Sequence, residues 1–251
     1  MMLNLANMES SSGIKVPLFS YSEVESTMDV ARSLAEEGKI GVVVAEKQNR
    51  GRGRRGRNWL SPEGGLYFTL IVRPEIPSKK AHLLSLASGV AVARAIKKEY
   101  DLSVTLKWPN DVLYGGRKVA GILLEMAPGE KVPKYALIGI GVNVNHPVSQ
   151  FESSGVALCE ILGRRLSREE LLRSILKELY TIFEDFSPEE VLSTWRTLSD
   201  TLGRKVRVAS PEGLFIGMAC GVDEEGALIL KTEEGRKIRI LAGDCLYLRK
   251  V

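Results

Sequence analysis

The feature that most constrains the fold is a glycine- and arginine-rich segment between two apolar runs. Residues 51–57 read Gly-Arg-Gly-Arg-Arg-Gly-Arg, and the runs at 41–45 and 66–72 are long enough to form strands. Glycine lets a backbone approach a ligand closely, and arginine offers a planar fork of donors that suits carboxylate and phosphate oxygens. We therefore expect a cationic loop between two strands that clamps an anionic group.

Three other interpretations of this segment are open at this stage. It matches G-x-G-x-x-G, the dinucleotide-binding fingerprint, but that motif needs a helix where residues 58–65, Asn-Trp-Leu-Ser-Pro-Glu-Gly-Gly, indicate turns. The arginines could instead contact nucleic acid, or form a solvated run of surface charge. A net charge of +4 over 251 residues is only mildly basic and does not by itself imply a nucleic-acid partner.

Cysteine and histidine usage narrows the classes of site. Cys159, Cys220 and Cys245 form no C-x-x-C pair, so neither a zinc site nor a disulfide framework is indicated, and we assign no metal site. With only His82 and His146, a histidine-based metal site or a Ser-His-Asp triad is disfavoured. The N-terminus lacks the features of a signal peptide, and no apolar run approaches the roughly 20 residues that span a bilayer. We expect a cytoplasmic protein without a membrane partner.

Hydrophobic periodicity and turn residues predict the order of the remaining elements. Residues 1–15 are expected to be a loose leader. Strands are expected at 18–23, 41–47, 66–73, 102–107, 112–114, 117–125 and 135–145, and helices at 28–37, 81–98, within 166–186 and at 191–198. Thr27 is the expected N-cap of the first helix and Gly38 its stop, and the same helix N-terminus could hold a polar ligand.

The pattern changes near residue 200, where helices give way to short strands. Strands are expected at 205–208, 214–222, 227–231, 237–240 and 246–248, separated by turns that contain glycine. Short strands about ten residues apart are typical of a small β-barrel. We therefore expect two domains, a larger one at 1–200 and a C-terminal β-domain at 201–251.

Five segments, taken in order, carry a resemblance to a known family. They are Glu-Ser-Thr at 25–27, Gln48 with the arginine segment and Asn-Trp at 58–59, Lys-Trp-Pro-Asn-Asp at 107–111, Arg-Lys-Val-Ala-Gly-Ile-Leu-Leu-Glu at 117–125, and Gly-Ile-Gly-Val-Asn-Val-Asn at 139–145. Together they resemble the biotin–protein ligases over about residues 18–150. The arginine segment with Lys-Trp-Pro-Asn-Asp is the specific part, whereas Ser-Thr or the last segment alone would be weak.

The resemblance implies a fold and a reaction. The fold is α+β: a catalytic domain like that of class II aminoacyl-tRNA synthetases, with a mixed, largely antiparallel sheet and helices, followed by a small SH3-like C-terminal β-barrel. The reaction converts the substrate biotin and ATP, with Mg²⁺, to biotinyl-5′-AMP and pyrophosphate. The biotinyl group then passes to one lysine of a biotin carboxyl carrier protein domain. By family analogy a homodimer is expected and a DNA partner is not.

The same resemblance assigns roles to individual residues. The catalytic residues are expected to be Lys118, Arg52 and Arg54. The biotin-binding residues are expected to be Ser26, Thr27, Gln48, Gly51, Arg52, Gly53, Arg54, Lys118 and Gly121. The ATP-binding residues are expected to be Arg54, Arg55, Trp59, Lys107, Asn110 and Asn143. Without the resemblance, Lys118 would be an exposed strand-edge lysine, Trp59 a loop anchor, and Asp111 a turn residue that satisfies backbone N–H groups.

Two departures and two rival functions bear on this interpretation. Met28 follows Ser26 and Thr27 where the family often has a short polar residue, which puts a side-chain contact from that position in doubt. About fifteen residues precede the first strand, so we expect the ligase-only type without an N-terminal helix-turn-helix domain. A lipoate–protein ligase shares the adenylation chemistry, and a nucleic-acid-binding module would use the basic loop and the barrel. We also expect the arginine loop to be mobile when empty and ordered by ligand.

Overall fold

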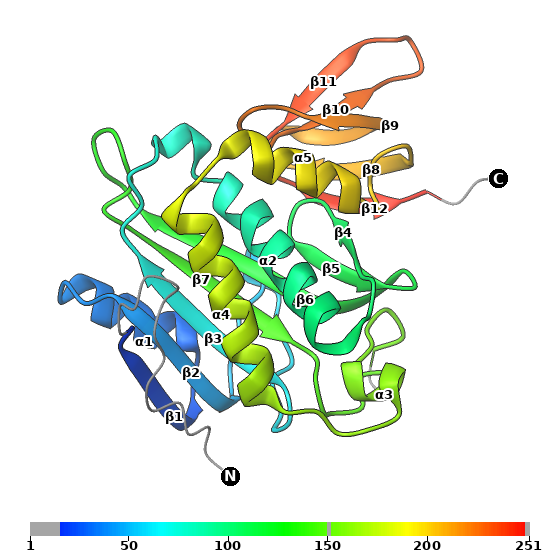
Figure 1. The fold of residues 1–251 in the computed structure, drawn as a ribbon. Coiled ribbons are helices and arrows are strands. Elements are labelled where there is room, and N and C mark those ends of the chain that lie inside the picture. Colours follow the sequence, from blue (N-terminus) through cyan, green and yellow to red (C-terminus); the bar gives the residue numbers. More distant parts are fainter. Residues whose placement is uncertain (1–15, 150–151, 249–251) are drawn as a thin grey trace.

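The larger part of the chain forms a seven-stranded sheet with the order β1-β2-β3-β7-β6-β5-β4 (Figure 1). The computed structural model describes residues 16–149 and 152–248, so the predicted leader at 1–15 lies outside the described residues. The strands are β1 (Leu18–Val24), β2 (Gly41–Gln48), β3 (Leu66–Val72), β4 (Thr105–Lys107), β5 (Asp111–Tyr114), β6 (Arg117–Ala127) and β7 (Tyr135–Val142). Strands β1 and β2 are parallel and all other neighbours are antiparallel, as expected for a mixed, largely antiparallel sheet.

Helices cover the two faces of this sheet unequally (Figure 1). Helices α2 (Leu83–Tyr100), α4 (Arg168–Glu184) and α5 (Pro188–Leu198) pack together on one face, over the main hydrophobic core. Helix α1 (Thr27–Glu36) packs on the other face against β2, β3 and β7, over a small cluster of buried side chains. Because α2, α4 and α5 all lie on the first face, this second face is left largely free beside α1 (Figure 1). That free face carries the site described below.

The C-terminal part forms a five-stranded antiparallel sheet with the order β11-β10-β9-β8-β12. Its strands are β8 (Lys205–Ser210), β9 (Gly213–Val222), β10 (Leu228–Lys231), β11 (Lys237–Ile240) and β12 (Asp244–Tyr247). It is joined to the turn between β4 and β5, where the indole Nε1 of Trp108 donates to the Gly226 carbonyl at 3.1 Å and the Trp108 backbone N–H donates to Thr201 Oγ1 at 2.9 Å. These contacts place the C-terminal sheet beside the end of the large one.

The predicted α+β fold is confirmed, with local corrections. Ser26, and not Thr27, is the N-cap of α1, because its hydroxyl accepts from the backbone N–H of Met28 while Thr27 begins the helix. The strand expected at 102–107 is confined to Thr105–Lys107, and the last strand begins at Asp244 and not at 246. Helix α3 (Leu158–Leu162) was not predicted, since five residues carry too little periodicity. The domain boundary near residue 200 stays a prediction. Within the described ranges no helix is both long and apolar enough to cross a membrane.

Candidate active site

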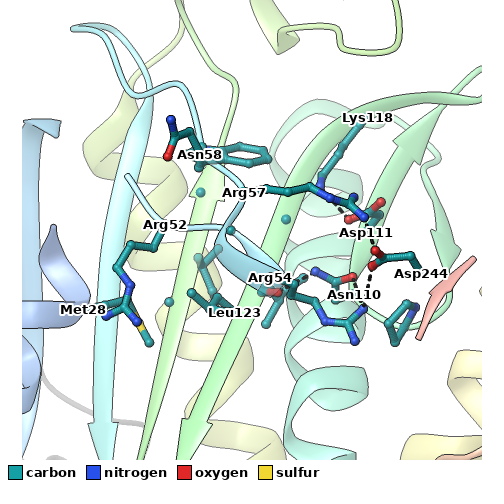
Figure 2. Close-up of a pocket in the computed structure, with 18 of the residues that line it drawn as sticks. Met28, Arg52, Arg54, Arg57, Asn58, Asn110, Asp111, Lys118, Leu123 and Asp244 are labelled. Atoms are coloured by element: carbon teal, nitrogen blue, oxygen red, sulfur yellow. Dashed lines mark hydrogen bonds and ion pairs between the residues drawn. The ribbon is translucent and has the colours of Figure 1, made fainter. Parts of the chain in front are cut away.

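A cavity of about 230 Å³ opens beside α1, where the arginine segment, the large sheet and the C-terminal sheet meet (Figure 2). Most of the residues expected to bind biotin or ATP line it, and they come from segments that are far apart in the chain. Those that line it are Ser26, Thr27, Gln48, Arg52, Gly53, Arg54, Trp59, Lys107, Asn110, Lys118 and Gly121. Gly51, Arg55 and Asn143 do not line it. The sequence motifs therefore converge in space, although they are spread over nearly a hundred residues.

One end of the cavity is neutral and hydrogen-bonded. Thr69 Oγ1 donates to Thr27 Oγ1 at 2.9 Å, and Thr27 Oγ1 donates to Gln48 Oε1 at 3.1 Å. Gln48 Nε2 then donates to Ser61 Oγ at 2.9 Å, and Ser61 Oγ donates to the Trp59 carbonyl at 2.9 Å. The Thr27 backbone N–H also donates to Gln48 Oε1, at 2.9 Å. This chain of donors and acceptors fixes the orientation of the Gln48 amide, which a neutral polar ligand would meet.

The floor of the cavity is built of glycine. Gly121 on β6 and Gly141 on β7 are direct partners across the two strands. The indole of Trp59 lies over them, since a Cβ added at Gly141 would be 2.4 Å from Trp59 Nε1, and one at Gly121 would be 3.1 Å from the indole ring. Trp59 Nε1 is buried and has no hydrogen-bond partner among the described residues. A buried donor without a partner costs about 1–3 kcal/mol, so this indole N–H is available to a ligand.

Met28 stands where the family often has a short polar residue, and its side chain makes an apolar contact. Its side chain is buried against β7, where a Cβ added at Gly139 would be 2.7 Å from the Met28 sulfur. Its backbone N–H is held by the Ser26 hydroxyl at 3.3 Å, which is the N-cap of α1. Met28 therefore contributes apolar wall to the cavity, as does Leu123.

Lys118 extends from β6 into the cavity toward Asp111 (Figure 2). Its Nζ lies 2.7 Å from Asp111 Oδ1 and 4.9 Å from the centroid of the Trp59 ring. Asn143 contacts the backbone of the same strand: its buried side-chain amide donates to the Lys118 carbonyl at 3.2 Å. The nucleotide contact expected of Asn143 thus has no support in the geometry and stays a prediction. Asp111 was also interpreted as a turn residue that satisfies backbone N–H groups. In the structure its carboxylate holds the Lys118 ammonium group in the cavity.

The first arginine of the loop faces the neutral end. Arg52 forms ion pairs at 2.7 Å with both Asp29 on α1 and Glu125 on β6. Glu125 also pairs with Arg32, so two arginines share this carboxylate. The Arg52 guanidinium lines the cavity. An anionic ligand that entered there would compete with two carboxylates for it.

The other three arginines converge on one carboxylate of the C-terminal sheet. Arg54 lies 3.9 Å and Arg55 3.6 Å from Asp244, and Arg57 is in direct contact with it. Arg54 also donates to the Gly243 carbonyl at 3.0 Å and to Asn110 Oδ1 at 3.4 Å. Burial lowers the pKa of the Arg54 guanidinium from its ordinary value, and the nearby arginines lower it further, against the opposing effect of Asp244. Figure 2 shows this cluster at the opposite end of the cavity from Met28.

Several lining residues were not predicted from sequence. Asp244, Cys245 and Leu246 reach the cavity from β12, and Thr69 and Ser61 complete the neutral chain from behind. Burial raises the pKa of the Cys245 thiol to about 11, so it lines the cavity as a neutral group at physiological pH. Within residues 16–149 and 152–248, no group of three or more histidine, cysteine, aspartate or glutamate side chains could hold a metal ion by itself.

Family models match both parts of the chain. The model described as the biotin/lipoate A/B protein ligase family matches residues 21–143. The model described as the biotin protein ligase C terminal domain matches residues 201–247. The first match covers the segments that build most of the cavity, and the second covers the sheet that carries Asp244.

Individual proteins are similar over most of their length. The bifunctional ligase/repressor BirA of Bacillus subtilis (strain 168) is 36% identical over 226 residues, which are 86% of this chain and 68% of BirA. A biotin–acetyl-CoA-carboxylase ligase of Mycobacterium tuberculosis (strain ATCC 25618 / H37Rv) is 32% identical over 216 residues, 83% of this chain and 79% of that ligase. Among solved structures, the biotin protein ligase from Aquifex aeolicus in complex with biotin and ATP superimposes with a TM-score of 0.78 at 32% identity. That match covers 93% of this chain and 99% of the Aquifex aeolicus chain.

Proposed function

Since the chain belongs to the biotin/lipoate A/B protein ligase family, we propose that it attaches biotin to a lysine of a biotin carboxyl carrier protein domain through biotinyl-5′-AMP. The observation that carries the proposal is the cavity itself. It joins a neutral hydrogen-bonding end, a glycine floor and a cluster of cations within one space. A ligand with a neutral polar ring, an apolar chain and an anionic end would match those three parts in turn.

The first step needs two anions to meet. A biotin carboxylate oxygen attacks the α-phosphorus of ATP, the bond from that phosphorus to the bridging oxygen of the β-phosphate breaks, and pyrophosphate leaves. Placed cations lower the repulsion and stabilise the charge that grows on the phosphorus oxygens. Lys118 is suited to bridge the two reactants, with Arg52 at the biotin carboxylate and Arg54 at the phosphates.

The remaining contacts follow from the same orientation. Ser26, Thr27 and Gln48 lie at the end suited to the neutral ureido ring of biotin, and Gly121 lets the ligand approach the strand. Trp59 is suited to stack on adenine. The cavity of about 230 Å³ is smaller than the roughly 300–1,000 Å³ of pockets that enclose a drug-sized ligand. Trp59 and the arginine loop would therefore have to move before biotin and ATP bind together.

The nucleotide substrate is MgATP. The cation neutralises part of the phosphate charge when it enters with ATP. The carboxylates of Asp111 and Glu152 line the cavity and provide oxygen ligands of the kind that Mg²⁺ prefers. Lys107 and Asn110 lie beside Asp111 and are suited to contact the nucleotide. Gly51, Arg55 and Asn143, which do not line the cavity, keep their predicted roles only through the family resemblance.

In the second step the neutral amine of the acceptor lysine attacks the acyl carbonyl. A C–N bond forms, the acyl–phosphate C–O bond breaks, AMP leaves, and the amine gives up a proton. Closure of the loop over the adenylate would exclude water, which otherwise hydrolyses the mixed anhydride. No residue is assigned as the base for this step.

The two rival functions are less consistent with the site. The match of residues 201–247 is to a biotin protein ligase C-terminal domain, which favours biotin over lipoate. The four loop arginines are engaged with Asp29, Glu125 and Asp244, which disfavours a free basic surface for nucleic acid. We also propose a cytoplasmic location, a homodimer, no DNA partner, and domains at 1–200 and 201–251.

The proposed function is tested by following pyrophosphate release from MgATP with and without biotin. The expected result is biotin-dependent release, followed by biotin transfer to a purified biotin carboxyl carrier protein domain, detected by a mass increase on one lysine. Lipoate at the same concentration is the matched control and is expected to give neither signal. Release with lipoate and none with biotin would replace the proposal with the lipoate alternative.

A further inference from the structure

The C-terminal sheet has an unusually apolar outer face. The structure describes seven large apolar side chains as exposed, and four of them lie on this sheet. Leu214, Ile216 and Met218 alternate along β9, and Leu246 lies on β12. Because residues two apart point to the same side of a strand, the three β9 side chains share one face. Contiguous exposed apolar surface of this kind marks interaction sites in soluble proteins.

The pairing of the strands places Leu246 on the same face. Leu246 pairs with Arg207 on β8, and Arg207 pairs with Ile216 on β9. Met218 pairs with Lys205 on β8, and this pair lies two residues along the strands from the pair of Ile216 with Arg207. We call this surface the β9 face: it consists of Leu214, Ile216, Met218 and Leu246, with Lys205 and Arg207 between β9 and β12.

The β9 face runs directly into the cavity. Leu246 is half exposed and also lines the cavity. Asp244 lies two residues before it on β12, so it points to the same side of the sheet, and it holds the loop arginines there. A protein seated on the β9 face would therefore lie against the rim through which the acceptor lysine must enter.

The charge on the face is positive. Arg207 is exposed, and among the described residues its side chain has no ion-pair partner. Lys205 pairs at 2.6 Å with Glu233, but both side chains are exposed, at 47% and 77%, and such pairs contribute little. The face thus fits a partner surface with an apolar centre and acidic groups around it.

We propose that the β9 face is the docking surface for the carrier domain, because this face is continuous with the cavity that the acceptor lysine has to reach. The inference rests on the proposed function and extends it from the reaction to the recognition of the protein substrate. A second copy of this chain fits less well. An isologous contact through the β9 face would cover Leu246 and with it the rim of the cavity in both copies.

The test separates docking from adenylation in the full-length chain. Ile216→Asp puts a carboxylate at the centre of the face, and Arg207→Glu reverses its charge. Ile40→Asp is the matched control, because Ile40 is also about half exposed but lies just before β2, at the opposite end of that strand from Gln48. Steady-state transfer is measured with a purified biotin carboxyl carrier protein domain, and pyrophosphate release is measured with biotin and MgATP alone.

The expected result is a KM for the carrier domain that rises at least tenfold in Ile216→Asp and at least threefold in Arg207→Glu. Carrier-independent pyrophosphate release should stay at the wild-type level, which also shows that the variants fold, and Ile40→Asp should change neither. If Ile216→Asp loses carrier-independent pyrophosphate release, the substitution has disturbed the fold, and the KM of Arg207→Glu for the carrier domain then decides the test.

Two results would overturn the inference. One is an unchanged KM for the carrier domain in the deciding variant. The other is a variant whose oligomeric state, measured by light scattering, differs from that of the wild-type chain while its KM for the carrier domain is the same. That result would assign the β9 face to a contact with a second copy. If the wild-type chain itself releases no biotin-dependent pyrophosphate, the proposed function fails, and this outcome is distinct from a failure of the docking surface alone.

Discussion

The two ends of the cavity are held by different kinds of interaction. At the neutral end, Thr27, Gln48 and their neighbours form hydrogen bonds of 2.9 to 3.1 Å between α1, the large sheet and Ser61, and each of these donors has its acceptor. At the charged end, Arg54, Arg55 and Arg57 reach across to a single carboxylate, Asp244, on another sheet. The neutral end is a preformed polar surface, whereas the charged end is a set of ion pairs that a phosphate could replace.

The two ends are expected to respond differently to a ligand. A hydrogen-bonded end that is already satisfied needs little reorganisation to meet a neutral ring. At the charged end, the three arginines would exchange the Asp244 carboxylate for the oxygens of a triphosphate. Arginine binds carboxylate and phosphate in the same forked geometry. We therefore expect changes at the charged end to alter the rate of the reaction most, and changes at the neutral end to alter biotin affinity and the stability of the fold.

The largest effect is expected from Arg54→Ala. Arg54 lines the cavity and is mostly buried, so its loss removes a cation from the place where phosphate charge develops. We expect biotin-dependent pyrophosphate release to fall by about 10²–10³-fold, as for single donors in other enzymes. Arg50→Ala is the control, because Arg50 is 84% exposed and pairs only with Glu25 outside the cavity. Equal rates for the two variants would contradict the role of the charged end.

The glycine floor between the two ends should be the next most sensitive. A Cβ at Gly141 would collide with the Trp59 indole at 2.4 Å, so Gly141→Ala must displace that ring. Overpacking of this kind costs about 1–3 kcal/mol, which predicts a matching loss in the free energy of unfolding or of biotin binding. Gly221→Ala is the control, since a Cβ there meets open space. Chemical denaturation and biotin titration of both variants check the prediction. If Gly141→Ala has the stability and biotin affinity of the wild-type chain, the Trp59 indole is not packed in a fixed position over Gly141.

The neutral end is tested by Thr27→Val, which keeps the shape of the side chain and removes its hydroxyl. Gln48 Oε1 and Thr69 Oγ1 would each lose a partner, and a lost buried hydrogen bond costs about 1–2 kcal/mol. We expect that loss in unfolding free energy, together with weaker biotin binding and an unchanged KM for MgATP. Thr197→Val on the exposed side of α5 should stay within about 0.5 kcal/mol of wild type. A raised KM for MgATP with normal biotin affinity would reverse the assignment of the two ends.

The smallest effect is expected from Asp244→Asn, which removes the charge that holds three arginines. Partly exposed ion pairs contribute about 0.2–1 kcal/mol each, so the loop should open only a few times more often. We expect trypsin to cleave within residues 52–57 roughly threefold to tenfold faster than in wild type, with MgATP protecting both forms. Glu233→Gln, in the turn between β10 and β11, should leave this rate unchanged. Slower cleavage in Asp244→Asn would show that Asp244 does not restrain the loop.

The sequence predicted the parts of the site that local patterns encode. The arginine loop, Lys118 and the Lys-Trp-Pro-Asn-Asp turn stand out because each combines unusual residues within a short stretch. The regular strands and long helices were also predicted, since periodicity over eight or more residues reports burial directly.

Other parts depend on neighbours that are distant in the chain. Asp244 looks like an ordinary surface acid until the fold brings it to arginines almost 190 residues earlier. Thr69 sits in an apolar strand, where its bond to Thr27 leaves no local signal. Only the family resemblance places Asn143 at the nucleotide, and no local pattern indicates that its side-chain amide donates to the Lys118 carbonyl. Ser26 and Thr27 are both good caps, and the choice between them is visible only in the structure, where the Ser26 hydroxyl accepts from the Met28 backbone N–H and the Thr27 hydroxyl donates to Gln48.

The most direct test of the account is a biotin titration and a pyrophosphate-release assay on the wild-type chain and on Lys118→Ala. Lys118 lies between the two ends, 2.7 Å from Asp111 and over the Trp59 ring. The account predicts saturable biotin binding and biotin-dependent release in wild type, with release reduced at least a hundredfold in the variant. Full release by Lys118→Ala would contradict the bridging role of this lysine, and an absence of biotin binding by the wild-type chain would contradict the proposed function.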